Sequence, residues 1–180
     1  MAGVADSERR ERAAHAAPAS SPLATGDTLA HLLGRGAPRA PDRDSLEAWG
    51  RALGAVLPRP SVITLEGDLG AGKTTLARAL CAGIGVRDLT AVTSPTFALI
   101  QQYEAPRGPV VHADLYRLRT DAELEALGWD EIVHHAPVLL VEWPERALPS
   151  LPSSRIGIVL EHDPVNADRR TLRVVSQAVA

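Results

Sequence analysis

The stretch Gly67–Thr74 reads GDLGAGKT and matches the full pattern G-x-x-x-x-G-K-[ST] of a phosphate-binding loop. Lys73 within it is the only lysine among the 19 basic residues of this 180-residue chain. A lysine ammonium is a compact charge on a flexible stem, whereas a planar guanidinium is too wide to reach the β- and γ-phosphates past a tightly wrapped backbone. The choice of lysine at this one position predicts that the loop binds a nucleoside triphosphate.

The segments on either side of the loop supply the context that this motif requires. Residues 61–66 are rich in β-branched side chains, which indicates a buried strand. Residues 75–82 are good helix formers, and the glycines at 83 and 85 are typical of a helix end. A plain strand-to-helix turn is the alternative, but the combination favours phosphate binding through backbone N–H groups and the helix N-terminus. The expected nucleotide contacts are Leu69, Gly70, Ala71, Gly72, Lys73, Thr74 and Thr75.

Length and composition indicate one domain, which we expect to span residues 42–180. With 45% apolar residues, 180 residues bury a single core. Residues 1–41 are rich in Ala, Arg, Pro and Ser, and we expect a disordered extension with helical structure at most from Thr28 to Leu33. A mitochondrial transit peptide is a weaker alternative, because acidic residues interrupt the basic ones.

Charge, apolar runs and cysteine content limit the classes of partner. No apolar run approaches the 18 residues of a membrane span, and a single cysteine excludes an internal disulfide, so we expect a cytoplasmic protein. The net charge is −3, and the expected domain contains no basic run longer than a pair. We therefore expect the chain to meet RNA only indirectly. We also expect it to be monomeric alone.

The remaining periodicities predict an α/β fold. An amphipathic helix follows a capping box at residues 44–47. Strands are expected at 98–103, 110–113 and 137–141, a short helix at 121–127, and an antiparallel pair from residues 156–160 and 172–174. The predicted architecture is a three-layer fold like that of P-loop NTPases, with a mainly parallel sheet and antiparallel additions in the C-terminal part.

Two of the predicted strands end in a carboxylate. Asp114 follows Val110–Ala113, and Glu142 follows an apolar run typical of a Walker B strand. Ligands gather at the carboxyl ends of strands in an open α/β sheet, and a P-loop enzyme needs acids to hold Mg²⁺ and to orient water. Each acid could instead cap its strand in solvent, but the P-loop favours a functional role. We expect the Thr74 hydroxyl to ligate Mg²⁺.

Residues 93–97 and His112 allow two interpretations each. The loop reads TSPTF, and its hydroxyl groups suit a switch that senses the γ-phosphate, although an ordinary turn explains it equally well. His112 is expected to be a buried strand residue rather than a metal ligand, because no Cys/His cluster accompanies it.

These motifs, in their order and rough spacing, resemble the TsaE (YjeE) family over about residues 42–162. The matching segments are GDLGAGKTT at 67–75, TSPTF at 93–97, HADLYRL at 112–118 and VEWPER at 141–146. One departure is Ala113, where the family usually has Phe. The other is an N-terminal extension longer than the family core requires.

The resemblance implies the ATPase component of the bacterial tRNA threonylcarbamoyladenosine system, with ATP and Mg²⁺ as cofactors and the TsaB–TsaD heterodimer as partner. It implies that TsaE proteins do not transfer the threonylcarbamoyl group themselves. Thr74 and Glu142 would hold the metal, and Asp114 would support hydrolysis by orienting water or by supporting the metal shell. Thr96 would belong to the switch segment, and Trp143 and Glu145 would lie near the nucleotide. The implied catalytic residues are Lys73, Asp114 and Glu142.

Other classes of P-loop protein compete with this interpretation. A small-molecule kinase would share the loop, and Arg117 and Arg119 could clamp a transferred phosphoryl group. A regulatory GTPase is disfavoured, because its N-K-x-D motif needs a second lysine. A nucleotide-dependent interaction module would differ from the family only in not requiring turnover.

Overall fold

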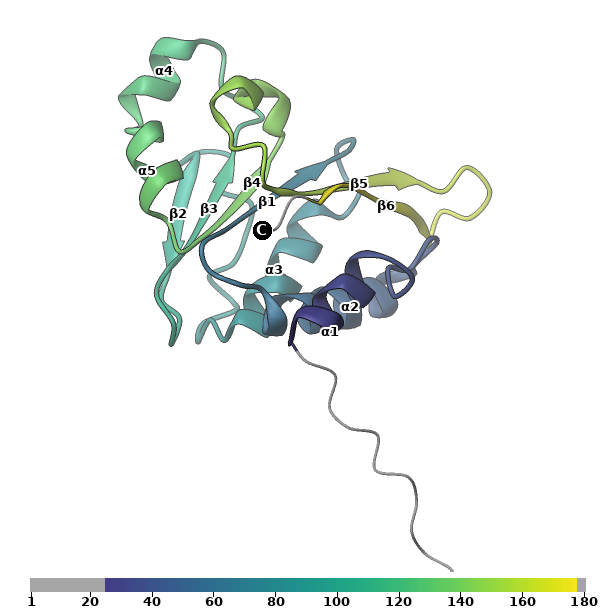
Figure 1. The fold of residues 1–180 in the computed structure, drawn as a ribbon. Helices are drawn as coiled ribbons and strands as arrows, with labels where there is room; N and C mark the ends of the chain where they lie inside the picture. The colour runs from purple at the N-terminus through teal and green to yellow at the C-terminus, as the bar shows by residue number, and fades with distance from the viewer. Residues whose placement is uncertain (1–24, 178–180) are drawn as a thin grey trace, which may run out of the picture.

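The computed structural model describes residues 25–177 (Figure 1). The N-terminal half contains α1 (Thr25–Leu33), α2 (Arg43–Val56), β1 (Ser61–Glu66), α3 (Lys73–Ile84), β2 (Ile100–Tyr103) and β3 (Val110–Asp114). The C-terminal half contains α4 (Asp121–Ala126), α5 (Trp129–His135), β4 (Val138–Glu142), the 3₁₀ turns η1 (Pro144–Arg146) and η2 (Leu148–Ser150), β5 (Ile156–His162) and β6 (Arg170–Gln177).

All six of these strands form one sheet in the order β2-β3-β4-β1-β5-β6. The four central strands β3, β4, β1 and β5 are parallel. At the two edges, β6 runs antiparallel to β5 and β2 runs antiparallel to β3. The predicted fold class is confirmed, including the antiparallel pair in the C-terminal part. The antiparallel edge strand β2 was not predicted as such.

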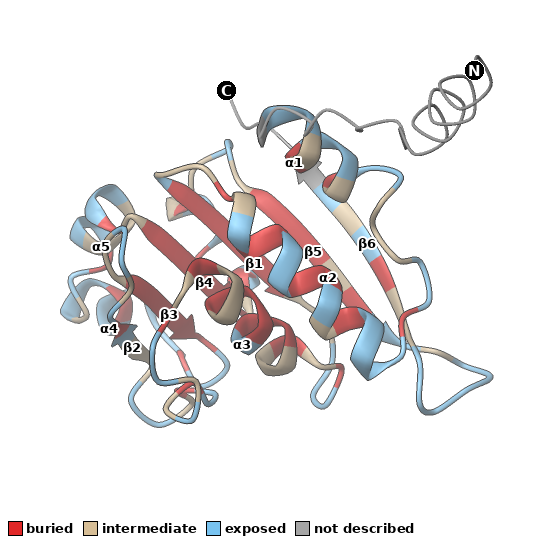
Figure 2. Ribbon diagram, turned by 90° about the horizontal axis from the view of Figure 1, so that it is seen from below, coloured by how far each residue is buried: buried red, intermediate tan, exposed pale blue. Residues whose placement is uncertain are grey.

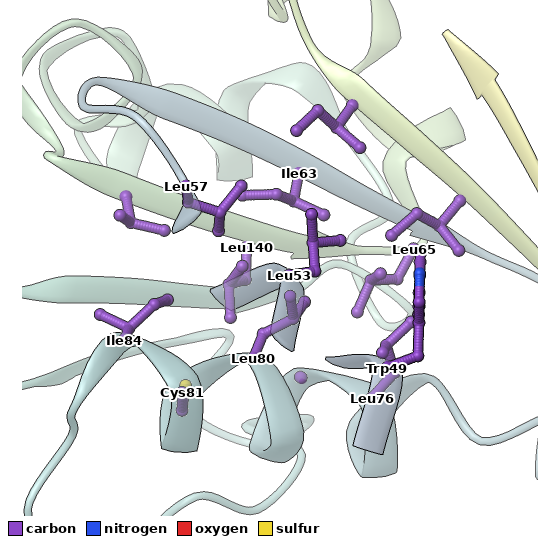
Figure 3. Close-up of a cluster of buried hydrophobic side chains, with 14 of the residues drawn as sticks. Trp49, Leu53, Leu57, Ile63, Leu65, Leu76, Leu80, Cys81, Ile84 and Leu140 are labelled. Carbon is purple, nitrogen blue, oxygen red and sulfur yellow. The ribbon is translucent and has the colours of Figure 1, made fainter. Parts of the chain in front are cut away.

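Helices on both faces of the sheet make the fold three-layered. Helices α1, α2 and α3 lie on one face (Figures 1 and 2), whereas α4, α5 and the two 3₁₀ turns lie on the other (Figure 1). Alternate residues of β1 point to opposite sides, so that Ile63 and Leu65 join one apolar cluster and Val62 joins the other. Figure 3 shows the first cluster, in which Leu53 of α2 and Leu80 of α3 meet the sheet.

The helices agree with the sequence prediction in part. The N-cap of helix α2 is Asp42, two residues before the expected N-cap Asp44, and its side chain accepts a hydrogen bond from the Ser45 N–H. Gly85 ends α3 in the left-handed conformation (φ 95°), as expected. Gly128 separates α4 from α5, and α5 was not predicted.

The expected disordered extension is corrected for residues 25–41. Leu29 and Leu33 of α1 are buried in the cluster shared with α2, α3 and the sheet. The indole N–H of Trp49 donates to the Leu32 carbonyl at 3.0 Å. The carbonyls of Arg39 and Pro41 accept hydrogen bonds from the backbone of β6. The packed part of the chain therefore includes residues 25–41, and the rest of the expected extension, residues 1–24, lies outside the described residues.

The helices of the structure can be compared with the length of a membrane span. Within residues 25–177, none of the helices has the length and apolar character needed to cross a bilayer.

Candidate nucleotide site

The sheet order brings the loop and the two acidic strand ends to one edge. Within the sheet, Glu142 is in register with both Asp114 of β3 and Leu65 of β1, and the loop follows β1 directly. A cavity of about 590 Å³ opens there. Of the predicted site residues, those that line it are Leu69, Gly70, Gly72, Lys73, Thr74, Thr75, Thr96, Asp114, Glu142 and Trp143.

Two predicted residues lie elsewhere. Ala71 lines a neighbouring cavity of about 270 Å³, which shares Gly70, Gly72 and Thr75 with the large cavity, and Glu145 lines neither cavity. Glu145 belongs to η1, which turns away after β4 because Trp143 takes a left-handed conformation (φ 58°). Its carboxylate still lies within electrostatic range of Lys73.

The Lys73 ammonium lies inside the curl of the loop. Its Nζ donates to the carbonyl oxygens of Gly67 at 2.7 Å and Asp68 at 2.9 Å, and it stands 3.9 Å from the ring centroid of Trp143. Burial lowers the pKa of Lys73 below its ordinary value, whereas nearby carboxylates, first Glu142, act in the opposite direction. The only lysine of the chain is thus held in the cavity as a partly desolvated cation beside an aromatic ring.

Thr74 and Glu142, the two residues expected to ligate Mg²⁺, contact each other. The Thr74 hydroxyl donates to Glu142 at 2.9 Å from Oε1 and 3.2 Å from Oε2, and Glu142 is 2% exposed. A hydroxyl and a carboxylate are hard oxygen ligands that suit Mg²⁺, which usually keeps several waters and takes further oxygens from substrate phosphates. Within residues 25–177, no group of three or more His, Cys, Asp or Glu residues could hold a metal by itself. The pair therefore fits Mg²⁺ bound together with a nucleotide.

Behind this pair lies an interaction that the sequence analysis missed. His112 is fully buried in β3, as predicted, and its Nε2 is 3.0 Å from Glu142 Oε1. Its Nδ1 is 3.3 Å from the hydroxyl of Tyr103 in β2. His112 precedes Asp114 by two residues on one strand, and the two-residue period of a strand could have indicated that both point to the same face.

Asp114 fastens the loop at residues 93–97 to the edge of the sheet. Its Oδ2 accepts hydrogen bonds from the hydroxyls of Ser94 and Thr96, the latter at 2.8 Å. The second carboxylate oxygen, Oδ1, accepts the Tyr116 N–H at 3.1 Å. Ser94 and Thr96 also line the large cavity, so this acid connects the loop to the cavity wall.

The two arginines of the kinase alternative lie in different places. Arg117 lines the cavity, with its guanidinium carbon 4.2 Å from the ring centroid of the exposed Phe97. Arg119 is not among the cavity residues, and its backbone N–H donates to Glu123 at the start of α4.

A second missed residue supports the loop from β6. Arg170 donates from Nε to the Ala71 carbonyl at 3.2 Å and from Nη2 to the Gly70 carbonyl at 3.5 Å. Because these hydrogen bonds hold the two carbonyl groups toward Arg170, they favour a loop conformation in which the backbone N–H groups face the inside of the loop. No local pattern could reveal this contact, because about 100 residues separate the partners.

A glycine loop between β1 and α3, a buried lysine within it, and acids at the ends of two neighbouring parallel strands define a protein of the P-loop class. The family model described as "Threonylcarbamoyl adenosine biosynthesis protein TsaE" matches residues 40–172. The chain belongs to the TsaE family, whose members act in tRNA threonylcarbamoyladenosine biosynthesis. The resemblance noted in the sequence is thereby confirmed.

Individual relatives show the extent of the similarity. The TsaE protein of Synechocystis is 42% identical over 63% of this chain and 72% of its own length. The TsaE protein of Bacillus subtilis is 43% identical over 61% of this chain and 67% of its own length. The crystal structure of YdiB from Bacillus subtilis superposes with a TM-score of 0.60 at 31% identity, covering 78% of this chain and 84% of YdiB.

Proposed function

We propose that this chain binds ATP with Mg²⁺ and hydrolyses it as an accessory protein of the tRNA threonylcarbamoyladenosine pathway, together with TsaB and TsaD. The observation that carries the proposal is the contact of Thr74, from the loop, with Glu142, from the neighbouring strand. This contact joins the two predicted metal ligands beside the only lysine of the chain. Membership of the TsaE family supports the pathway.

In the proposed mechanism, the loop binds the phosphates and the strand ends organise the metal. Backbone N–H groups from Leu69 to Thr74 and the N-terminus of α3 would face the phosphate oxygens. Lys73 would leave the loop carbonyls to pair with the β- and γ-phosphates. Thr74 and Glu142 would hold Mg²⁺, which neutralises charge on the phosphates when bound.

We assign to Asp114 the task of holding the loop at residues 93–97 against the nucleotide. Its Oδ2 accepts the hydroxyls of Ser94 and Thr96, so that both side chains lie on the cavity wall. A γ-phosphate in the cavity would compete for these hydroxyls, and its loss on hydrolysis would return them to Asp114. The remaining Asp114 oxygen stays tied to the Tyr116 N–H, which keeps the carboxylate in place.

We also propose that TsaB and TsaD dock where the cavity opens. Leu69 and Phe97 line the cavity and are 72% and 87% exposed, so both offer apolar surface that a partner could cover. A protein that covers them would exclude water from the cavity.

The net charge of −3 supports only an indirect role for tRNA, and the free, buried Cys81 is compatible with the cytoplasm.

The kinase alternative receives less support from the site. Of the two arginines that could clamp a phosphoryl group, Arg119 lies outside the cavity, and Arg117 lies over Phe97. An acceptor substrate would also require a binding site of its own beside the γ-phosphate.

The test is ATP hydrolysis by the purified chain with Mg²⁺ or EDTA, alone and with the TsaB–TsaD pair. The variant Lys73→Ala serves as the inactive blank, and its thermal melt checks that it is folded. We expect phosphate release that requires Mg²⁺ and rises with the partners. Full activity of Lys73→Ala would contradict the P-loop assignment, and partner-independent phosphoryl transfer to a metabolite would favour the kinase.

A further inference from the structure

Three buried polar side chains, linked by hydrogen bonds, lie at and behind the proposed metal ligands. The series starts at Tyr103 in β2, passes through His112 in β3 and reaches Glu142 at the end of β4. These residues are 5%, 0% and 2% exposed. Buried polar groups cost free energy unless they are hydrogen-bonded, and the proposed mechanism so far gives His112 no task.

The hydrogen bonds distinguish the two oxygens of Glu142. Oε1 accepts from Thr74 at 2.9 Å and lies 3.0 Å from His112 Nε2. A carboxylate can only accept, so Nε2 is the donor in this pair. Oε2 has a single and longer contact, at 3.2 Å to the same Thr74 hydroxyl. The carboxylate is therefore anchored through Oε1, and Oε2 keeps the capacity to face a cation in the cavity.

We propose that His112 is a positioning residue that holds Glu142 Oε1 and thereby presents Oε2 to Mg²⁺. The inference rests on the proposed function, because it assigns His112 to the same metal site. A hydrogen bond from a residue behind a metal ligand orients that ligand toward the metal. Here the imidazole itself does not touch the metal, since Glu142 stands between it and the cavity.

Tyr103 completes the support on the far side of the imidazole. Its hydroxyl lies 3.3 Å from His112 Nδ1 and 3.2 Å from Gln101 Oε1. Burial raises the pKa of Tyr103 to about 12, so this hydroxyl keeps its proton at neutral pH. The imidazole thus has a partner at each nitrogen, which fixes the plane of the ring and the direction of the Nε2–H bond.

The experiment compares the affinity for ADP in excess Mg²⁺ with the affinity in EDTA, by isothermal titration calorimetry, for His112 variants. Glutamine places its amide nitrogen about where Nε2 lies, whereas the shorter asparagine places it near Nδ1, and phenylalanine keeps the ring without a donor. We expect His112→Phe and His112→Asn to bind ADP normally in EDTA but to lose roughly tenfold or more of the gain from Mg²⁺. His112→Gln should keep most of that gain.

Val111→Ala is the matched control, because Val111 is buried on the same strand and belongs to the apolar cluster of the opposite face. It should lower the melting temperature and leave the Mg²⁺ gain unchanged. If His112→Phe does not fold, the contrast between glutamine and asparagine decides. The role of His112 is overturned if His112→Asn keeps the wild-type gain in ADP affinity from Mg²⁺. It is also overturned if the variant loses as much ADP affinity in EDTA as it does in Mg²⁺. Either result leaves the proposed function standing. No Mg²⁺-dependent binding by the wild type would overturn the proposed function as well.

Discussion

Replacing Gly67 with alanine is expected to destabilise the protein far more than the same change at Gly70, although both glycines belong to the phosphate-binding loop. Gly67 has φ +134°, and an alanine Cβ there would lie 1.9 Å from the Leu160 carbonyl oxygen of β5. Gly70 has φ +78°, and the nearest atom to its Cβ would be His162 Cε1 at 3.9 Å. An alanine at either position would have a strained positive φ, but only at Gly67 would its Cβ also overlap a neighbouring atom.

The expected free energies follow from these two geometries. At Gly67, strain of on the order of 1–3 kcal/mol adds to a steric overlap that costs about 1–3 kcal/mol, for a sum near 4 kcal/mol. At Gly70, only the left-handed backbone is penalised, by about 1–2 kcal/mol. For a chain of this size, 1 kcal/mol lowers Tm by roughly 2–4 °C, which predicts a loss of roughly 8–16 °C for Gly67→Ala and roughly 2–8 °C for Gly70→Ala.

Thermal unfolding followed by far-UV circular dichroism measures both losses, and denaturant titration converts them to free energies of unfolding. The reasoning fails if Gly67→Ala melts at or above the temperature of Gly70→Ala. That result would mean that β5 moves away from the loop at little cost, and that close packing against Leu160 does not hold the loop in place.

Two further changes test the support of the loop and the contribution of α1 to stability. Arg170→Ala should weaken ADP binding by roughly tenfold through the lost bonds to the Ala71 and Gly70 carbonyls, whereas Arg173→Ala, which loses only an exposed ion pair with Glu161, should not. Equal affinities of the two variants in calorimetry would remove Arg170 from the site. Deletion of residues 1–33 should lower Tm by roughly 5–10 °C, because it removes the buried Leu29 and Leu33. Deletion of residues 1–24 is the control and should leave Tm unchanged, and equal melting of both truncated chains would show that α1 adds no stability.

The elements that the sequence predicted well are those with a strong local pattern. The β-branched run of β1 and the apolar run of β4 each occur at the predicted place, and Gly85 ends α3 as expected. The two acids at strand ends could be placed at one edge of the sheet, because parallel strands bring their carboxyl ends together. These predictions required only the pleat of a strand, the period of a helix and the conformational freedom of glycine.

The predictions that failed or stay untested were those that depended on distant partners. Residues 25–33 have a weak helical pattern, and α1 gains its place because α2 and the sheet bury Leu29 and Leu33. Ala71 and Glu145 were expected beside the nucleotide from their positions in motifs, and neither lines the large cavity, so their contact with a nucleotide stays a prediction.

The sequence by itself determined that a phosphate-binding loop lies between a buried strand and a helix, and that two strands each end in an acid, because each of these features lies in consecutive residues. Only the tertiary structure decided which of these groups meet. Thr74 reaches Glu142 across 68 positions, His112 reaches it across 30, and Arg170 reaches the loop across about 100. Such contacts depend on strand order and register, which arise from packing of the whole chain rather than from any local pattern.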